Sequence, residues 1–183
     1  MGPIPTRTAV LVPVEPAEQV VRRHRRDLDV AASWGVPAHV TVLFPFVPPA
    51  RVDADVISRR TAALAQVEPF DATFRHCAWF GEEVLWLAPE RDHEFRDLTL
   101  AVAEAFPDHP PYGGVFDEVT PHLTIGQVGR GATSPDQLRA AEADVAAHLP
   151  IRAHLDHALL MAGAEEPGSW HTLARLPLGA GLS

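Results

Sequence analysis

A four-residue pattern that occurs twice places the strongest constraint on how this chain can fold. His39-Val40-Thr41-Val42 lies in the first quarter of the sequence, and His122-Leu123-Thr124-Ile125 repeats the pattern in the second half. Residues two apart on a β-strand point to the same face. Each copy therefore predicts a strand that presents a histidine and a threonine on one face and apolar side chains on the other.

The repeat is improbable as a coincidence. The chain has 10 histidines among 183 residues, and 46% of its residues are hydrophobic. The full pattern is then expected about 0.17 times by chance, and two matches have a probability on the order of one per cent. A single His-x-Thr strand is usually only a strand with two half-exposed polar residues. The pair indicates a shared site.

Charge limits the partners that the chain can bind. The formal net charge of −9 argues against broad binding to a long polyanion, but it is compatible with a small anionic substrate held at a local positive site. Every basic residue is an arginine, so lysine-dependent mechanisms are excluded. The only dense basic cluster contains Arg22, Arg23, Arg25 and Arg26, and it is interpreted as a solvated helix face.

Composition also bears on location and cofactors. No apolar run approaches a membrane span and no secretory signal is visible, so a cytoplasmic protein is expected. The single cysteine, Cys77, excludes an internal disulfide and is expected to be a buried, unreactive thiol. His154 and His157 are expected on opposite faces of one strand, which makes a poor metal pair. Neither a metal nor a cofactor is expected.

The spacing of apolar and turn-forming residues predicts alternating strands and helices without an independent linker. Strands are expected over 8–14, 38–46, 70–80, 84–88, 119–128, 151–161 and 170–178, and helices over 15–32, 53–67, 92–106 and 134–148. Strand–helix–strand units on either side of a midpoint near residue 85 favour a duplicated architecture. Residues 1–183 are therefore expected to form one bilobal domain with one site between the lobes.

Two segments of the chain resemble those of a known family. The segments that carry the resemblance are His39-Val40-Thr41-Val42-Leu43-Phe44 and Pro121-His122-Leu123-Thr124-Ile125, the latter preceded by Pro111-Tyr112-Gly113-Gly114. Together with the chain length and the order of elements, they resemble the 2H phosphoesterase superfamily, and within it the bacterial 2′-5′ RNA ligase and cyclic phosphodiesterase-like proteins. The resemblance implies a two-lobed α+β fold whose antiparallel sheets flank a central cleft, with one His-x-Thr strand from each lobe. It also implies metal-independent action on 2′,3′-cyclic or related phosphodiesters.

The residue types are suited to that chemistry. Opening a cyclic phosphodiester with water requires a base for the water and an acid for the leaving ribose oxygen, and His39 and His122 are the candidates. Thr41 and Thr124 are expected to donate hydrogen bonds to the non-bridging phosphate oxygens. The sequence leaves open which histidine is the base. It also leaves open whether the reaction runs as hydrolysis or, in reverse, as 2′-5′ ligation.

Three further residues are candidates for substrate binding. Tyr112 either stacks on a nucleobase or packs against neighbouring prolines. Phe44 is a candidate cleft residue for which core packing is the alternative, and Arg130 is a candidate phosphate clamp. The expected partner is a small cyclic nucleotide or an RNA end that carries a 2′,3′-cyclic phosphate, bound by a monomer. The alternative functions are a non-catalytic nucleotide or RNA-end binder and, ranked last, a metal-dependent hydrolase.

Overall fold

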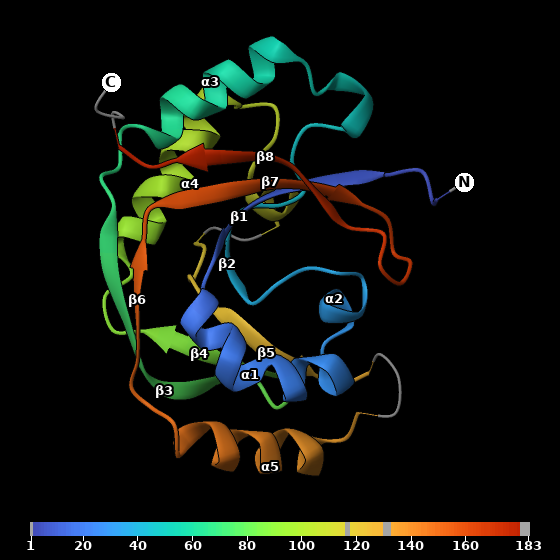
Figure 1. Cartoon of the computed structure of the whole chain (residues 1–183), viewed down its shortest axis with the longest axis vertical. Helices are drawn as coiled ribbons and strands as arrows, with labels where there is room; N and C mark the ends of the chain where they lie inside the picture. The colour runs from blue at the N-terminus through green and yellow to red at the C-terminus, as the bar shows by residue number, and fades with distance from the viewer. Residues whose placement is uncertain (1, 116–117, 130–132, 180–183) are drawn as a thin grey trace.

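Two four-stranded antiparallel sheets organise the molecule (Figure 1). The computed structural model describes residues 2–115, 118–129 and 133–179. The first sheet contains, in spatial order, β2 (His39–Leu43), β1 (Arg7–Pro13), β7 (His157–Gly163) and β8 (His171–Pro177). The second contains β5 (Leu123–Gln127), β4 (Val84–Pro89), β3 (Phe70–Phe80) and β6 (Ile151–Leu155). The expected α+β class with antiparallel sheets is confirmed.

Helices cover both sheets. They are α1 (Glu15–Leu28), α2 (Val30–Ser33), α3 (Ala54–Leu64), α4 (His93–Ala105) and α5 (Pro135–Ala146). The α3–α4 pair packs on the first sheet, and α1 and α5 pack on the second (Figure 1). Two helix starts follow from local chemistry, because the side chains of Asp53 and Ser134 each accept a hydrogen bond from a backbone N–H of the first turn. None of the helices in the described part of the chain is long and apolar enough to cross a bilayer.

Two predicted elements differ from the structure. The helix expected over 15–32 ends at Leu28, because Asp29 adopts an extended conformation and caps the separate helix α2. The single strand expected over 151–161 is wrong, because β6 ends at Leu155 and β7 begins at His157 in the other sheet. His154 and His157 therefore do not share a strand.

The two sheets are not formed by the two halves of the chain on either side of residue 85. The first sheet takes β1 and β2 from the start of the chain and β7 and β8 from its end, whereas β3 to β6 form the second. The expectation of sequential halves is therefore wrong, because the final hairpin pairs with β1 rather than with its neighbours in sequence. Each sheet nevertheless carries one motif strand, and β2 and β5 lie near one another.

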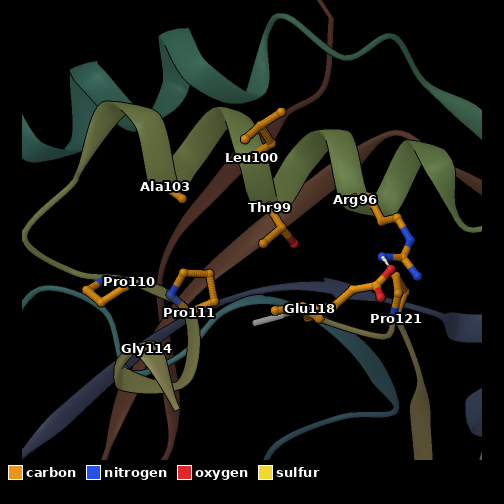
Figure 2. A pocket seen from close by; sticks show the side chains of 10 residues that line it. Arg96, Thr99, Leu100, Ala103, Pro110, Pro111, Gly114, Glu118 and Pro121 are labelled. Atoms are coloured by element: carbon orange, nitrogen blue, oxygen red, sulfur yellow. Dashed lines mark hydrogen bonds and ion pairs between the residues drawn. The ribbon is translucent and has the colours of Figure 1, made fainter. Parts of the chain in front are cut away.

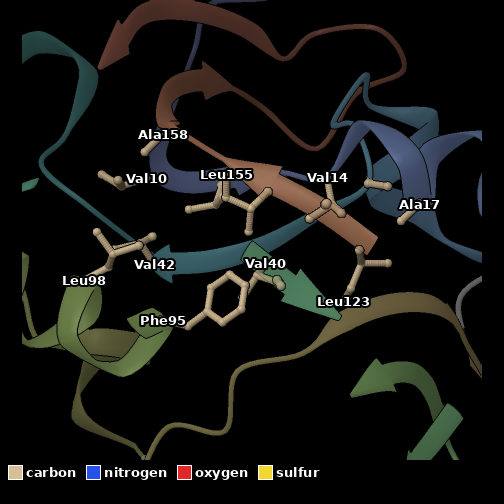
Figure 3. Close-up of a cluster of buried hydrophobic side chains, with 14 of the residues drawn as sticks. Val10, Val14, Ala17, Val40, Val42, Phe95, Leu98, Leu123, Leu155 and Ala158 are labelled. Atoms are coloured by element: carbon tan, nitrogen blue, oxygen red, sulfur yellow. The ribbon is translucent and has the colours of Figure 1, made fainter. Parts of the chain in front are cut away.

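A shared hydrophobic core fixes the orientation of both motif strands (Figure 3). Val40 and Val42 of β2 are buried in the same cluster as Leu123 and Ile125 of β5. His39 and Thr41, which alternate with the valines, are only partly buried. The predicted alternation of buried and partly buried residues is confirmed for both motifs. The strand expected over 119–128 is shorter than predicted, because β5 begins at Leu123 and His122 directly precedes it.

Candidate active site

The first motif histidine begins β2. The Nδ1 atom of His39 lies 2.7 Å from the carbonyl oxygen of Pro37. A carbonyl oxygen can only accept, so Nδ1 carries the proton and donates it. The second ring nitrogen, Nε2, is then the lone-pair nitrogen of the neutral imidazole.

The second motif histidine is held in the same way. His122 directly precedes β5, and its Nδ1 atom donates to the carbonyl oxygen of Thr120 over 2.7 Å. In both copies the acceptor is the backbone carbonyl two residues earlier. The repeat in sequence is therefore also a repeat in hydrogen bonding, and it selects the same tautomer of both rings.

Both motif strands also share an irregularity at the fourth motif position. In the β1–β2 pair, Leu11 faces Thr41 and Val10 faces Leu43, so Val42 is left without a partner. In the β4–β5 pair the register skips Ile125 in the same way. These are β-bulges, which bend a strand and change the direction of the side chains that follow.

The bulge at Ile125 places two polar side chains on one wall of a pocket. Thr124 and Gln127 are three residues apart, yet both line it. Gly126 lies between them with its face against two helices, where an added Cβ would lie 2.7 Å from the Cβ of Leu28 and 2.8 Å from a methyl of Leu138. Glycine is therefore required by close packing at this point.

This pocket has a volume of about 610 Å³ and is lined by the two polar residues of the second motif, His122 and Thr124. Its walls are formed by Phe80, Val84, Tyr112, Glu118, Val119, Thr120, His122, Thr124 and Gln127. His39 and Thr41 are not among the wall residues. Thr41 adjoins the pocket through Tyr112, whose side chain is hydrogen-bonded with that of Thr41.

Tyr112 bridges the two motifs. Its backbone N–H donates to the carbonyl oxygen of Phe44, just beyond β2, over 2.6 Å. Its φ of 49° lies in the left-handed region, which costs a non-glycine residue free energy and is frequent at functional sites. The burial of the ring raises the pKa of its hydroxyl. Tyr112 lies on the pocket wall, and which of its two expected roles it has stays a prediction.

The electrostatic surroundings of the two histidines differ. Burial lowers the pKa of His39 to about 3, with further contributions from the positive charge of Arg25 and from His122, against the opposing effect of the Pro37 hydrogen bond. The contribution of His122 means that the two rings lie within electrostatic range of one another. The pKa of His122 is lowered by burial, again opposed by its backbone hydrogen bond.

Aromatic side chains hold the His122 ring. Phe80 meets it edge to face, with ring centroids 4.9 Å apart, and Trp86 packs against it at 5.8 Å. Phe80 also stacks on Trp86 at 4.6 Å while remaining 37% exposed. The sequence interpretation missed both residues, because only the pairing of Trp86 with Thr124 across β4 and β5 reveals the contact.

A second, shallower pocket of about 370 Å³ lies beside the first (Figure 2). It separates α4 from the segment that leads to the second motif, and the two pockets share Glu118 and Val119. An ion pair between Arg96 of α4 and Glu118, at 2.8 Å, spans it.

The basic cluster of α1 is paired with carboxylates. Arg22 pairs with Glu18, Arg23 with Asp144, Arg25 with Asp29 and Arg26 with Asp27. The interpretation as a solvated face holds for the exposed members and is wrong for Arg25, which is 2% exposed. Helical geometry turns Arg25 inward with Val21 and Leu28, three to four residues away on the same face.

Phe44 and Arg130 are the remaining candidates for substrate binding. Phe44 packs against Trp170 with ring centroids 6.3 Å apart, and it does not line the pocket. Arg130 lies outside the described residues. Cys77 is partly buried, and burial raises its pKa to about 11, as expected for an unreactive thiol. Within residues 2–115, 118–129 and 133–179, no three His, Cys, Asp or Glu side chains are grouped so that they could hold a metal ion.

Comparisons with known proteins agree with this architecture. The model of the 2′-5′ RNA ligase superfamily matches residues 12–166. No curated protein matches the sequence.

Similar solved structures include Escherichia coli LigT in its apo form, with 17% identity, a TM-score of 0.58 and coverage of 96% of this chain and 99% of that one. LigT complexed with 3′-AMP is 16% identical, with a TM-score of 0.57 and coverage of 97% and 100%. TT0787 of Thermus thermophilus is 14% identical, with a TM-score of 0.56 and coverage of 96% and 99%. At these identities the likeness shows the fold.

Proposed function

Because the chain belongs to the 2′-5′ RNA ligase superfamily of 2H phosphoesterases, we propose that it is an enzyme that opens a 2′,3′-cyclic or related cyclic phosphate. The substrate is a small nucleotide or an RNA end. The observation that carries this proposal is the repeated histidine geometry, in which each Nδ1–H donates to the carbonyl two residues earlier. Both rings thus present the same nitrogen for proton transfer.

The different environments of the rings favour distinct roles. His39 stays neutral across the physiological range because its pKa is about 3, so it is suited to accept a proton from the attacking water. His122 is the proton donor to the leaving ribose oxygen. The negative charge of a bound phosphodiester raises the pKa of both rings, which brings them closer to the range in which proton transfer is efficient.

In this mechanism the water oxygen forms a bond to phosphorus while Nε2 of His39 takes its proton. The bond between phosphorus and one ribose oxygen breaks, and His122, which in the substrate complex carries a proton on both ring nitrogens, supplies its Nε2 proton to that oxygen. The hydroxyls of Thr41 and Thr124 donate to the non-bridging oxygens, where negative charge increases in the transition state. The reverse sequence, with a ribose hydroxyl in place of water, would join two ends.

Two observations support a nucleotide as the substrate. Solved structures of LigT, which shares this fold, are complexes with 3′-AMP, NADP+ or ATP. In this chain the pocket wall contains the exposed ring of Phe80 and the ring of Tyr112, and aromatic rings stack well on nucleobases. Glu118 and Gln127 supply hydrogen-bonding groups on the same wall.

The test is turnover by the purified protein in EDTA with nucleoside 2′,3′-cyclic phosphates, ADP-ribose cyclic phosphate and RNA ends. His39→Ala and His122→Ala should each lower kcat by about 10²–10⁴-fold, because each removes one partner in proton transfer. His148→Ala is the matched control, since that Nδ1 also donates to a backbone carbonyl, that of Asp144, but outside the pocket.

Three outcomes would contradict the proposal. Equal inactivity of wild type and both histidine variants on every substrate would exclude the enzyme. Tight nucleotide binding without turnover, unaffected by the substitutions, would favour the non-catalytic binder. Activity abolished by EDTA and restored by zinc or manganese would favour the metal-dependent hydrolase.

A further inference from the structure

We propose that Arg25 of α1 is a positioning residue that holds His39 for proton transfer, an inference that rests on the catalytic role proposed for His39. Arg25 does not touch the pocket. It acts through the three residues that precede β2, and it does so from a position that is almost completely buried.

Arg25 joins α1 to the segment before β2. Its Nε and Nη2 atoms donate to one carboxylate oxygen of Asp29 over 3.0 and 2.8 Å. Nη2 also donates to the carbonyl oxygen of Val36 at 3.2 Å. The other Asp29 oxygen accepts the backbone N–H of Ala31, which fixes the carboxylate in place. The guanidinium group is therefore held by a rigid partner and directs one donor toward the strand that carries the motif.

Glu18, two turns earlier on the same face of α1, holds the other end of the same segment. Its Oε2 atom accepts the backbone N–H of Ala38 at 2.5 Å and lies 3.6 Å from Nη1 of Arg25. Val36 and Ala38 are thus both tied to α1. The residue between them, Pro37, provides the carbonyl that receives Nδ1–H of His39. A continuous set of contacts leads from Arg25 to the orientation and tautomer of the imidazole.

The energetics favour a role beyond stability. A buried ion pair recovers little more than the cost of removing its charges from water, and an apolar pair of similar size is often as stable. Arg25 and Asp29 are both buried. In addition, burial lowers the pKa of His39 and the charge of Arg25 lowers it further, whereas the shift at His122 arises from burial. The two motif histidines make equivalent hydrogen bonds, but only the pKa shift of His39 has a contribution from Arg25.

The first test reads His39 directly, by NMR of the full chain labelled at its histidines. In wild type, His39 should show the Nδ1–H tautomer and titrate well below the ordinary value. The charged and titratable groups around it are Arg25 and His122, and the carboxylates Glu18 and Asp29 that contact Arg25. Arg25→Met should weaken the tautomer preference and raise the titration midpoint by about one pH unit. Arg25→Lys keeps the charge but lacks the planar set of donors, so it should retain the midpoint better than the tautomer.

The second test measures kinetics on whichever substrate wild type turns over. Because a misplacement of about 1 Å is enough to cost on the order of 10²-fold, Arg25→Met should lower kcat by about that factor. KM should stay within about twofold, since Arg25 does not line the pocket. Glu18→Ala removes the acceptor for Ala38 and the carboxylate near Nη1 of Arg25. It leaves the hydrogen bonds of Arg25 to Asp29 and Val36 in place, so it should show a smaller loss in the same direction. This variant also provides a result if Arg25→Met fails to fold.

Arg60→Met is the matched control. Arg60 on α3 is as deeply buried as Arg25, and among the described residues its guanidinium nitrogens have no hydrogen-bond partner. Its guanidinium group lies over the ring of Phe46, beyond the far end of β2. This variant should leave the tautomer and titration of His39 unchanged, together with kcat.

The outcomes separate this inference from the proposed function. If folded Arg25→Met and Glu18→Ala keep the tautomer, the titration and kcat of wild type, Arg25 is only structural and the inference is wrong. If Arg60→Met changes His39 as much as Arg25→Met does, the effect is not specific and the inference is also wrong. If wild type turns over no substrate but the NMR changes occur as expected, the proposed function fails while the link between Arg25 and His39 stands.

Discussion

At the scale of single residues, the two motif histidines lie in different environments. His39 and His122 make equivalent backbone hydrogen bonds. Behind His39 lies the buried cation of Arg25, whereas His122 lies against the rings of Phe80 and Trp86. Two titratable groups with different surroundings are how an enzyme obtains a base and an acid from one residue type. This difference in surroundings supports the separate roles proposed for the two histidines.

The lowered pKa of His39 predicts a stability that depends on pH. The folded value is about 3 and the ordinary value is 6.5, so between these limits the unfolded chain binds a proton that the folded chain does not. Stability should thus be complete above pH 6.5 and fall as the pH falls. The contribution of this group is about 2 kcal/mol between pH 7 and pH 5. Urea unfolding at pH 7, 6 and 5, compared with His39→Gln, measures it.

The comparison cancels the other titrating groups, because His122 and the carboxylates are present in both proteins. The advantage of wild type over His39→Gln should shrink toward acidic pH. A constant difference across the three pH values would show that His39 keeps an ordinary pKa in the folded chain.

At the scale of elements, each motif is a short strand with a bulge at its fourth residue. The alternation of polar and apolar residues correctly predicted the faces of β2 and β5. It did not predict the bulges, because an unpaired residue is defined only relative to the partner strand. Each bulge coincides with two adjacent buried residues after the threonine, Val42-Leu43 and Ile125-Gly126, where strict alternation would bury only one. A similar change of alternation marks the break between β6 and β7, where burial shifts from odd to even positions.

The close approach of α1 and α5 to β5 predicts the effect of Gly126→Ala. The added methyl would overlap Leu28 and Leu138, and overpacking of this kind costs about 1–3 kcal/mol. Because Thr124 and Gln127 flank the glycine on the pocket wall, kcat/KM should fall as well. Urea unfolding and steady-state kinetics measure the two effects.

Leu138→Ala provides the matching double-variant cycle. It removes one of the two overlaps, so the combined cost of Gly126→Ala and Leu138→Ala should be smaller than the sum of the separate costs. Strict additivity would mean that Leu138 does not oppose the new methyl group.

At the scale of the whole molecule, the two ends of the chain close the first sheet together. β1 pairs with β7 as well as with β2. The sheet that contains His39 is therefore incomplete until β7 and β8 are in place. The sequence predicted the strands of both lobes but assigned them to successive halves, because hydrophobic spacing carries no information on which distant strands pair. The core then joins the lobes, since residues of both sheets belong to one buried cluster (Figure 3).

This shared core predicts that the lobes unfold together. Leu160 of β7 and Leu87 of β4 are fully buried in different sheets but in the same cluster. Leu160→Ala and Leu87→Ala should each destabilise the protein by about 2–5 kcal/mol and shift a single transition. Urea unfolding followed by tryptophan fluorescence and far-ultraviolet circular dichroism checks this, because Trp170 reports on the first sheet and Trp86 on the second. If either variant separates the two signals into distinct transitions, the lobes are independent units, and the site between them would depend on how they dock rather than on a common core.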